Sequence, residues 1–194
     1  MNIQDVKRNY ERMTDNEFIH FATENAQGLR PEAFALVEEE ILRRKLDISL
    51  FDGVLAQNKT FSEEEIKSYA ELVRDLPCPI CNTTDDKLNG TMVHTLKSFI
   101  VFSYSQAEPL IGCSSCLDKA NNRAILSTAL LGWWGIPWGV IKTPIYIFRN
   151  LKAKTSNKLG SVNEVLLSYV LTHIGQLEAY KDKPEELRKV IARK

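Results

Sequence analysis

Two closely spaced cysteine pairs constrain this chain more than any other feature of its sequence. They are Cys78-Pro-Ile-Cys81 and Cys113-Ser-Ser-Cys116; they contain all four cysteines, and 31 residues separate one pair from the other. A CxxC turn directs both of its sulfur atoms toward one point, and four thiolates form a tetrahedral ligand set that suits Zn²⁺. We therefore expect Cys78, Cys81, Cys113 and Cys116 to hold one zinc ion, the only cofactor that the sequence predicts.

Other uses of the same four thiols stay open at the level of sequence. An iron–sulfur cluster takes the same ligands, and His94, which lies between the pairs, is an alternative ligand. A redox-active CxxC of the thioredoxin kind needs a βαβ pattern, and none surrounds Cys113 and Cys116. Unliganded buried thiols are the remaining alternative. Because four protein ligands leave no position for a substrate, a zinc ion held in this way is structural.

The N-terminal residues contain no apolar stretch of the kind that a signal peptide requires. We therefore expect a cytoplasmic protein, with attachment to the surface of the inner membrane as the alternative. The reducing environment of a cytoplasm favours metal ligation by paired cysteines over disulfide formation.

The residues between the cysteine pairs are typical of a β-hairpin. Segments 91–95 and 98–104 are rich in β-branched and aromatic residues, which favour strands. Asn89-Gly90 is a strong turn signal, so we expect the hairpin to turn there. Two cysteine knuckles joined by a β-hairpin make a zinc ribbon, and a segment this small depends on its metal for stability.

Outside this segment the sequence has helical periodicity. Three capping boxes, at Thr14, Ser62 and Ser161, each place a hydroxyl residue three positions before a glutamate and mark helix starts. Pro31 suits the first turn of a further helix over about 31–45. Apolar residues recur at helical spacing in each of these segments. The patterns predict an α+β fold that is mainly α.

The predicted elements suggest three parts. We expect an N-terminal helical module in residues 1–60, and a helix followed by the four-cysteine zinc ribbon in residues 61–118. Residues 119–194 are expected to form a Trp-rich apolar helical hairpin and C-terminal amphipathic helices. Within this third part, the polar and basic residues 150–160 indicate a loop, and residues 161–181 one helix.

The total charge hides a strongly basic segment. The chain has 25 basic and 25 acidic residues, so its net charge gives no general argument for nucleic-acid binding. Residues 119–158, however, contain seven bases and no acid. The bases are Lys119, Arg123, Lys142, Arg149, Lys152, Lys154 and Lys158.

Residues 124–141, AILSTALLGWWGIPWGVI, are uncharged and contain all three tryptophans. Their glycines and proline interrupt the middle of any helix, which favours a hairpin. Three interpretations stay open: a hairpin covered by the protein's own core or by a protein partner, a hairpin that enters a membrane surface, and a single membrane span. The candidate binding surface consists of Arg123, Trp133, Trp134, Trp138, Lys142 and Arg149.

Together these motifs resemble a group of uncharacterised, mostly bacterial zinc-ribbon proteins. The N-terminal segment, from YERMTDNEF onward, is similar to the small helical module that often precedes such ribbons, and the resemblance covers about residues 10–150. The resemblance implies structural zinc and a role in binding or scaffolding. It does not imply any enzymatic activity. The matching residues are Cys78, Cys81, Cys113, Cys116, Arg123, the segment 132–139 with sequence GWWGIPWG, Thr143-Pro144 and Asn150.

The sequence gives no motif for catalysis on a small molecule. It lacks GxxxxGK[ST], GxGxxG, HExxH and GxSxG, so we expect no enzymatic activity and no small-molecule substrate. The expected function is a zinc-stabilised interaction or adaptor module whose hairpin binds a protein partner or a membrane surface. One alternative is an immunity or inhibitor protein. Another is a nucleic-acid-binding ribbon that uses Lys97, Phe99, Phe102 and Tyr104.

Overall fold

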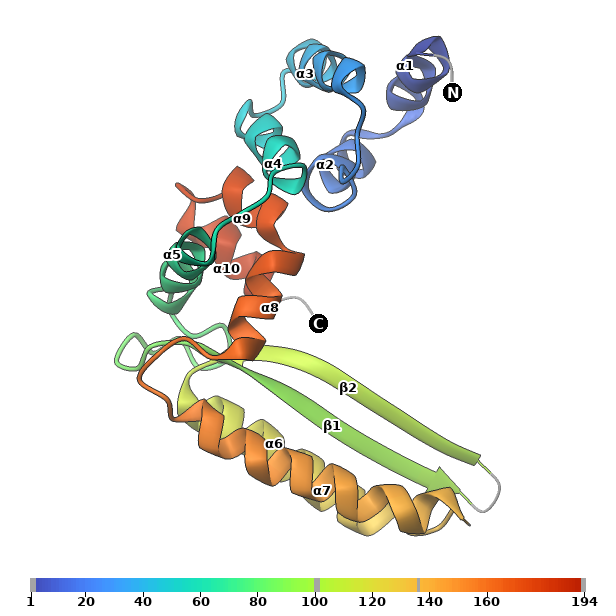
Figure 1. Cartoon of the computed structure of the whole chain (residues 1–194), viewed down its shortest axis with the longest axis vertical. Helices are drawn as coiled ribbons and strands as arrows, with labels where there is room; N and C mark the ends of the chain where they lie inside the picture. Colours follow the sequence, from blue (N-terminus) through green and yellow to red (C-terminus); the bar gives the residue numbers. More distant parts are fainter. Residues whose placement is uncertain (1–2, 100–101, 136, 193–194) are drawn as a thin grey trace. The chain divides into compact units, whose positions relative to one another are not determined.

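The computed structural model describes residues 3–99, 102–135 and 137–192, and the chain divides into two compact units (Figure 1). Unit 1 consists of Met1–Tyr69 and Val170–Val190, and unit 2 consists of Ala70–Tyr169 and Ile191–Lys194. The described residues are mainly helical and include one two-stranded antiparallel sheet. The predicted α+β, mainly α class is therefore confirmed.

Unit 1 is built from helices at both ends of the chain. Its core contains Phe18, Val37 and Ile41, which are fully buried, and Tyr10 packs against Phe18. The helices are α1 (Ile3–Arg12), α2 (Asp15–Glu24), α3 (Pro31–Arg44), α4 (Ser49–Gln57), α9 (Ile174–Ala179) and most of α10 (Pro184–Ala192). The chain leaves unit 1 within α5 (Glu63–Arg74) and returns within α8 (Glu164–Thr172).

The helix starts in this unit follow the local signals of the sequence. The Glu17 carboxylate accepts a hydrogen bond from the backbone N–H of Thr14 at 2.7 Å, and Thr14 Oγ1 accepts one from the N–H of Glu17. Ser62 and Glu65 make the same reciprocal pair. Pro31 occupies the first turn of α3. These predicted starts are confirmed because each one depends on neighbouring residues alone.

The C-terminal helices return to unit 1, so the division of the chain differs from the expected boundaries at residues 60 and 118. α4 and α9 pack closely, since a Cβ added to Gly53 would lie 2.5 Å from the carbonyl oxygen of Gly175. Such a contact joins segments that are far apart in the sequence, so no local sequence pattern predicts it.

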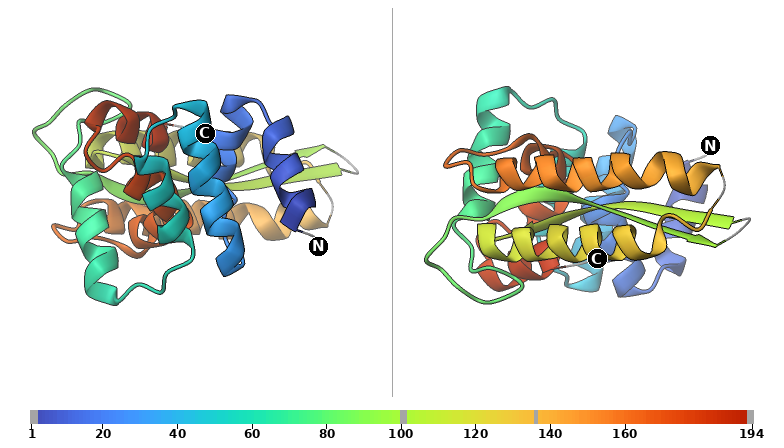
Figure 2. Two further views of the ribbon diagram at one scale, coloured as in Figure 1. Left: turned by 90° about the horizontal axis from the view of Figure 1, so that it is seen from above. Right: turned by 90° about the horizontal axis from the view of Figure 1, so that it is seen from below.

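Unit 2 contains a long β-hairpin packed on a pair of helices. Strands β1 (Asn89–Phe99) and β2 (Phe102–Gly112) pair antiparallel. Helices α6 (Ser114–Leu131) and α7 (Trp138–Asn157) lie side by side along the sheet (Figures 1 and 2), and β1 packs against both helices. The prediction that a β-hairpin joins the two cysteine pairs is confirmed.

The expected position of the hairpin turn is wrong. Asn89 and Gly90 begin β1, and the strands meet instead at the Phe99–Phe102 pair. Asn89 donates to the carbonyl oxygen of Ser161 at 2.9 Å. A Cβ on Gly90 would lie 2.8 Å from the backbone nitrogen of Leu166. Here Asn89-Gly90 does not form a turn. It allows the start of β1 to lie close to a segment that is distant in the sequence.

Two further expectations for the C-terminal part are also wrong. Residues 150–160 are not a loop, because α7 continues to Asn157. Residues 161–181 do not form one helix, since α8 and α9 are separate. The residue that caps α8 is Asn163 rather than Ser161: its side-chain oxygen accepts the N–H of Leu166 at 3.0 Å.

The uncharged stretch 124–141 is not one helix. α6 ends at Leu131, α7 begins at Trp138, and the chain reverses between them (Figure 1). The single-span interpretation is therefore wrong. Among the described residues, we find no helix with both the length and the apolar character needed to cross a membrane.

Candidate metal centre and exposed helical hairpin

The four cysteines meet next to the end of the sheet where β1 begins and β2 ends. Their sulfur atoms all lie within 4.8 Å of one another, and the Sγ atoms of Cys81 and Cys113 are 3.6 Å apart. That distance is too long for a disulfide, whose sulfur atoms are about 2.0 Å apart. Four sulfurs that converge in this way are placed to bind a single metal ion.

Each cysteine pair is held by local backbone geometry. In the first knuckle, the carbonyl oxygen of Cys78 accepts the N–H of Asn82 at 2.9 Å, and Asn82 is left-handed with φ 63°. In the second knuckle, Cys113 is the N-cap of α6. Asp86 joins the two knuckles, because its carboxylate accepts both the N–H and the hydroxyl of Ser114, at 2.9 and 2.7 Å. Asp86 thereby lies at the positive end of the α6 dipole.

Three of the thiols are buried and one is exposed. Cys78, Cys113 and Cys116 are buried, and Cys81 faces solvent. Burial raises the pKa of Cys113 and of Cys116. Burial also opposes ionisation of Cys78, but donated backbone N–H groups, that of Cys113 first, outweigh it and lower the pKa of Cys78 to about 7. A bound cation favours the thiolate at every one of these positions.

His94 does not belong to this cluster. It lies in the middle of β1 opposite Ala107, and its ring packs edge-on against Tyr146 with centroids 5.6 Å apart. Burial and the nearby Arg149 both lower the pKa of His94. The alternative in which His94 replaces a cysteine ligand is therefore wrong.

Behind the metal centre, asparagine side chains link the two helices to β1. Asn150 accepts the backbone N–H of His94 at 3.0 Å and donates to the carbonyl oxygen of His94 at 2.6 Å. Asn121 donates to Asn150 at 3.2 Å, and its own side-chain oxygen accepts from Asn157 and Thr91. Asn150 thereby satisfies the backbone groups of His94 on the outer edge of β1, which would otherwise be free to pair with another chain.

Sequence reasoning missed most of this polar interior. The buried polar side chains recur every seven residues, at Asn121 and Thr128 in α6 and at Thr143, Asn150 and Asn157 in α7. A seven-residue spacing brings residues to one side of a helix. This spacing is the sequence signal that could have predicted the buried polar residues. The motif residues that carry the resemblance include two of them, Thr143 and Asn150.

The turn between α6 and α7 has glycines on its inner side. A Cβ on Gly139 would lie 2.5 Å from the carbonyl oxygen of Gly132, and a Cβ on Gly135 would lie 2.6 Å from Oγ of Ser103. Both distances are shorter than real Cβ contacts, so the Gly132 carbonyl and the Ser103 hydroxyl come this close only because the two glycines have no side chain. The second contact also places the start of β2 beside this turn.

The three tryptophans lie on the outer side of the turn. Trp133, Trp134 and Trp138 are 46%, 65% and 59% exposed. Within unit 2, the interpretation that they form the protein's own core is therefore wrong. The interpretations that a protein partner or a membrane surface covers them remain.

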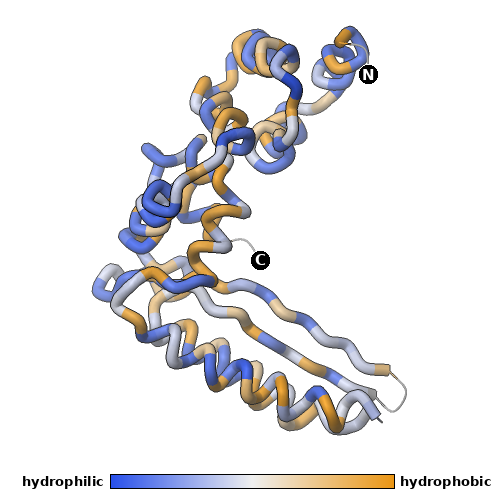
Figure 3. The backbone as a smooth tube through the Cα atoms, in the orientation of Figure 1, coloured by the Kyte–Doolittle hydropathy of each residue, from blue (hydrophilic) through white to orange (hydrophobic). Residues whose placement is uncertain are grey.

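The two helices carry polar residues inside and apolar residues outside. Figure 3 shows hydrophobic positions along both α6 and α7. We call one set of the exposed apolar side chains of these helices and their turn the hairpin face. It consists of Leu126, Leu130, Trp133, Trp134, Trp138, Ile141, Ile145 and Phe148, all at least 44% exposed. This is the reverse of an ordinary surface helix pair, whose apolar residues face inward.

The three candidate basic residues lie on the same two helices as the hairpin face. Arg123 and Arg149 are exposed, and Lys142 is half-buried. The ammonium group of Lys142 lies 5.7 Å from the ring centre of Trp138, and the guanidinium of Arg149 lies 5.7 Å from that of Tyr146. These are cation–π distances. Of the predicted set, the structure brings Lys142 and Trp138 together, whereas Arg149 contacts Tyr146 and Arg123 lies in the middle of α6.

The residues considered for nucleic-acid binding lie on the hairpin. Lys97 pairs with Tyr104 in the sheet register, and Lys97, Phe102 and Tyr104 are exposed. The side chain of Phe99 lies outside the described residues. These exposed groups belong to the same end of unit 2 as the tryptophans, because the start of β2 adjoins the α6–α7 turn.

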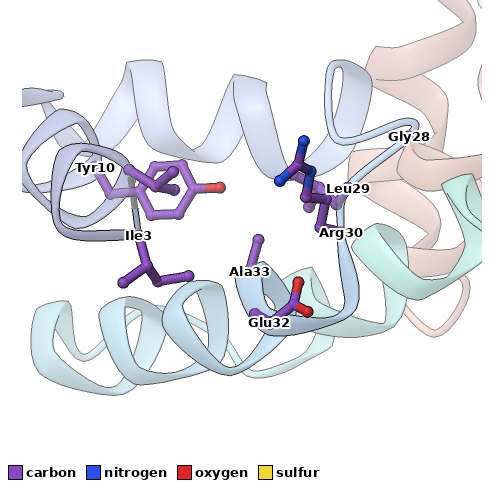
Figure 4. Close-up of a pocket in the computed structure, with 8 residues that line it drawn as sticks. Ile3, Tyr10, Gly28, Leu29, Arg30, Glu32 and Ala33 are labelled. Atoms are coloured by element: carbon purple, nitrogen blue, oxygen red, sulfur yellow. The ribbon is translucent and has the colours of Figure 1, made fainter. Parts of the chain in front are cut away.

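Unit 1 contains a separate cavity of about 420 Å³ beside α1 and the start of α3 (Figure 4). Its lining is mostly apolar and includes Ile3 and Tyr10, and Arg30 and Glu32 are its charged members. It belongs to a different unit from the cysteines and tryptophans.

The chain matches no family model, no curated protein and no solved structure. Its function is therefore inferred from the geometry of unit 2.

Proposed function

We propose that this chain is a non-enzymatic, zinc-stabilised interaction module that binds another molecule through the hairpin face. One observation carries the proposal: three tryptophans on one turn are about half exposed or more, beside further exposed apolar residues of α6 and α7. A contiguous apolar patch of this kind on a folded protein marks a binding surface, because leaving it in water costs free energy.

The donor set supports zinc as the metal. With zinc–sulfur bonds of about 2.3 Å, a tetrahedral site has neighbouring sulfurs about 3.8 Å apart. The 3.6 Å between Cys81 and Cys113 agrees with this value. Four thiolates complete the coordination of the ion and leave no open position for substrate, which supports a structural role.

The proposed role of the metal is to hold the root of the hairpin. Cys78 and Cys81 precede β1, and Cys113 and Cys116 connect β2 to α6. An ion bound by all four would tie the sheet to the first helix of the pair. In this arrangement the metal sets the positions of the elements that present the hairpin face.

Elemental analysis of gently purified protein tests the metal. We expect one zinc per chain, and loss of zinc in a Cys116→Ser variant but not in a Ser115→Ala variant. Two or four irons per chain, with inorganic sulfide and visible charge-transfer absorption, would contradict zinc and support the iron–sulfur alternative.

Photocrosslinking tests the hairpin face. A photoreactive phenylalanine analogue is placed at position 134, and in a control at position 42, which holds an equally exposed leucine in unit 1. In cells we expect defined protein or lipid adducts at position 134 that the control does not form. Equal and diffuse labelling at both positions would contradict a binding role for this face.

A further inference from the structure

We propose that the hairpin face binds an anionic lipid bilayer, with the α6–α7 turn inserted into one leaflet and the neighbouring bases at the headgroups. This inference rests on the proposed function above, since it names what the same face binds. It is carried by the order of side chains along both helices, by the aromatic residues at the turn, and by the charge of the segment.

Along α6, charge gives way to apolar surface toward the turn. Lys119 and Arg123 are exposed near the metal centre, and Leu126, Leu130 and Trp134 follow at helical spacing. The steps of three and four residues place the first four on one side of α6, and Trp134 follows in the turn after the helix ends at Leu131. The indole N–H of Trp134 donates to the carbonyl oxygen of Leu130, which aligns this ring with the same stripe.

Along α7, the same order runs in the opposite direction. Trp138, Ile141 and Ile145 are exposed next to the turn. Phe148 is the last apolar residue of this stripe. The exposed Lys152 follows one turn further along the same side of the helix. Two antiparallel helices thus share one gradient, apolar at the turn and basic away from it. A partner with an apolar interior and an anionic surface complements this gradient.

The depth of the apolar zone matches one leaflet. Arg123 lies eight positions before the end of α6 at Leu131, which corresponds to about 12 Å at 1.5 Å per residue, and the turn extends beyond that end. The hydrocarbon of one leaflet is about 15 Å thick. With the turn inserted, Lys119 and Arg123 would lie at the level of the lipid phosphates.

The turn end of unit 2 is rich in aromatic residues. The start of β2 adjoins the turn through Gly135 and Ser103, so the exposed Phe102 and Tyr104 lie at the same end as the tryptophans. Tryptophan and tyrosine concentrate at membrane interfaces because their rings are apolar and their N–H or O–H groups are polar. Lys142, stacked on Trp138, has a stem long enough for its ammonium group to reach the headgroups.

The distribution of polarity favours lipid over a protein partner. Residues 119–158 contain seven bases and no acid. Their buried positions hold asparagine, threonine and small residues, while many large apolar side chains are exposed. Asn121 donates to Asn150 and accepts from Asn157, and polar groups that pair beneath an apolar exterior suit a hydrocarbon environment.

Vesicle cosedimentation tests this inference. The zinc-loaded full chain is incubated with vesicles of phosphatidylcholine alone, or of phosphatidylcholine mixed with phosphatidylglycerol. We expect at least about tenfold tighter binding to the mixed vesicles, and loss of this difference in high salt. Tryptophan fluorescence should shift to shorter wavelength on binding, because the indoles leave water.

Matched variants separate the two parts of the surface. Trp134→Ala with Trp138→Ala should weaken binding to the mixed vesicles by about tenfold or more, since two exposed rings lose their apolar contact. Leu42→Ala with Leu55→Ala, which are exposed in unit 1, should leave binding unchanged. Arg123→Gln with Arg149→Gln should weaken binding to the mixed vesicles only. Thermal unfolding of each variant verifies that the fold is kept.

Wild-type and tryptophan-variant chains that sediment equally would overturn the lipid inference. Protein adducts at position 134 without vesicle binding would also overturn it while leaving the interaction module standing. Absence of both adducts and vesicle binding would overturn both proposals.

Discussion

At the scale of single residues, Asn150 shows how unit 2 is held together. One amide side chain satisfies both backbone groups of His94 on the outer edge of β1 and accepts a hydrogen bond from Asn121. A helix thereby replaces the neighbouring strand that β1 lacks on this side. Glutamine cannot substitute for this amide without displacement, because its side chain is one methylene longer.

Replacing Asn150 should destabilise unit 2. In Asn150→Ala, the N–H and C=O of His94 lose their partners, and we expect a loss of about 2–3 kcal/mol in the free energy of unfolding. Urea denaturation measures it. Asn122→Ala is the matched control, because Asn122 is exposed on α6 and its side-chain oxygen accepts from the surface Lys154. Equal stability of the two variants would show that the bridge to β1 contributes little.

Glu40 supplies a pH-dependent contribution to unit 1. Its buried carboxylate accepts hydrogen bonds from Arg43 and Arg44 at 2.6–2.7 Å, and these arginines, Arg43 first, lower the pKa of Glu40 from its usual 4.5 to about 2. A lowered pKa in the folded state stabilises the fold above pH 4.5. The contribution, about 3 kcal/mol in full, is lost as pH falls from 4.5 toward 2.

Glu40→Gln should remove this contribution and flatten the stability profile between pH 4.5 and 2. Denaturant unfolding across that range measures the effect, and Glu38→Gln on the exposed side of the same helix is the control. A Glu40→Gln profile parallel to that of the wild type would mean that other carboxylates cause the acid sensitivity.

At the scale of elements, the α6–α7 turn separates two roles among neighbouring residues. Gly132, Gly135 and Gly139 face inward and allow close contacts with backbone and side-chain atoms, whereas the tryptophans between them are exposed. The sequence GWWGIPWG is therefore a packing motif on one side and, in our proposal, a binding motif on the other.

Gly139→Ala should disturb the turn. Its Cβ would lie 2.5 Å from the carbonyl oxygen of Gly132, so the backbone must move, and we expect destabilisation of about 1–3 kcal/mol. Thermal unfolding is the measurement. Gly160→Ala is the control, because its Cβ meets no atom within 4 Å, and it should change the stability by less than about 0.5 kcal/mol. If both variants melt alike, close approach at the turn is not needed.

At the scale of the whole molecule, metal removal should affect the two units differently. The cysteines all belong to unit 2, while α2, α3 and α4 belong to unit 1. With a strong zinc chelator we expect amide hydrogen exchange in β1 and the first turns of α6 to become about tenfold faster or more. Exchange in α2, α3 and α4 should stay unchanged. Uniform acceleration throughout the chain would contradict a local role of the metal.

Several features of the protein were readable from the sequence because they depend on neighbouring residues. The cysteine spacing predicted the cluster, since each CxxC turn brings its own two sulfurs together. The Thr14 and Ser62 capping boxes marked real helix starts for the same reason. The glycines and proline of the Trp-rich segment correctly indicated a break between two helices.

Only the tertiary structure decided the rest. Asn89-Gly90 carries a turn signal, yet contact with Ser161 and Leu166 places it in a strand. The exposure of the tryptophans depends on which side of the turn packs against the sheet, and the local sequence does not specify that side. The return of α9 to α4 joins residues more than a hundred positions apart. Local chemistry determines where elements begin, whereas burial is a property of elements packed together, and that packing created both the asparagine network and the hairpin face.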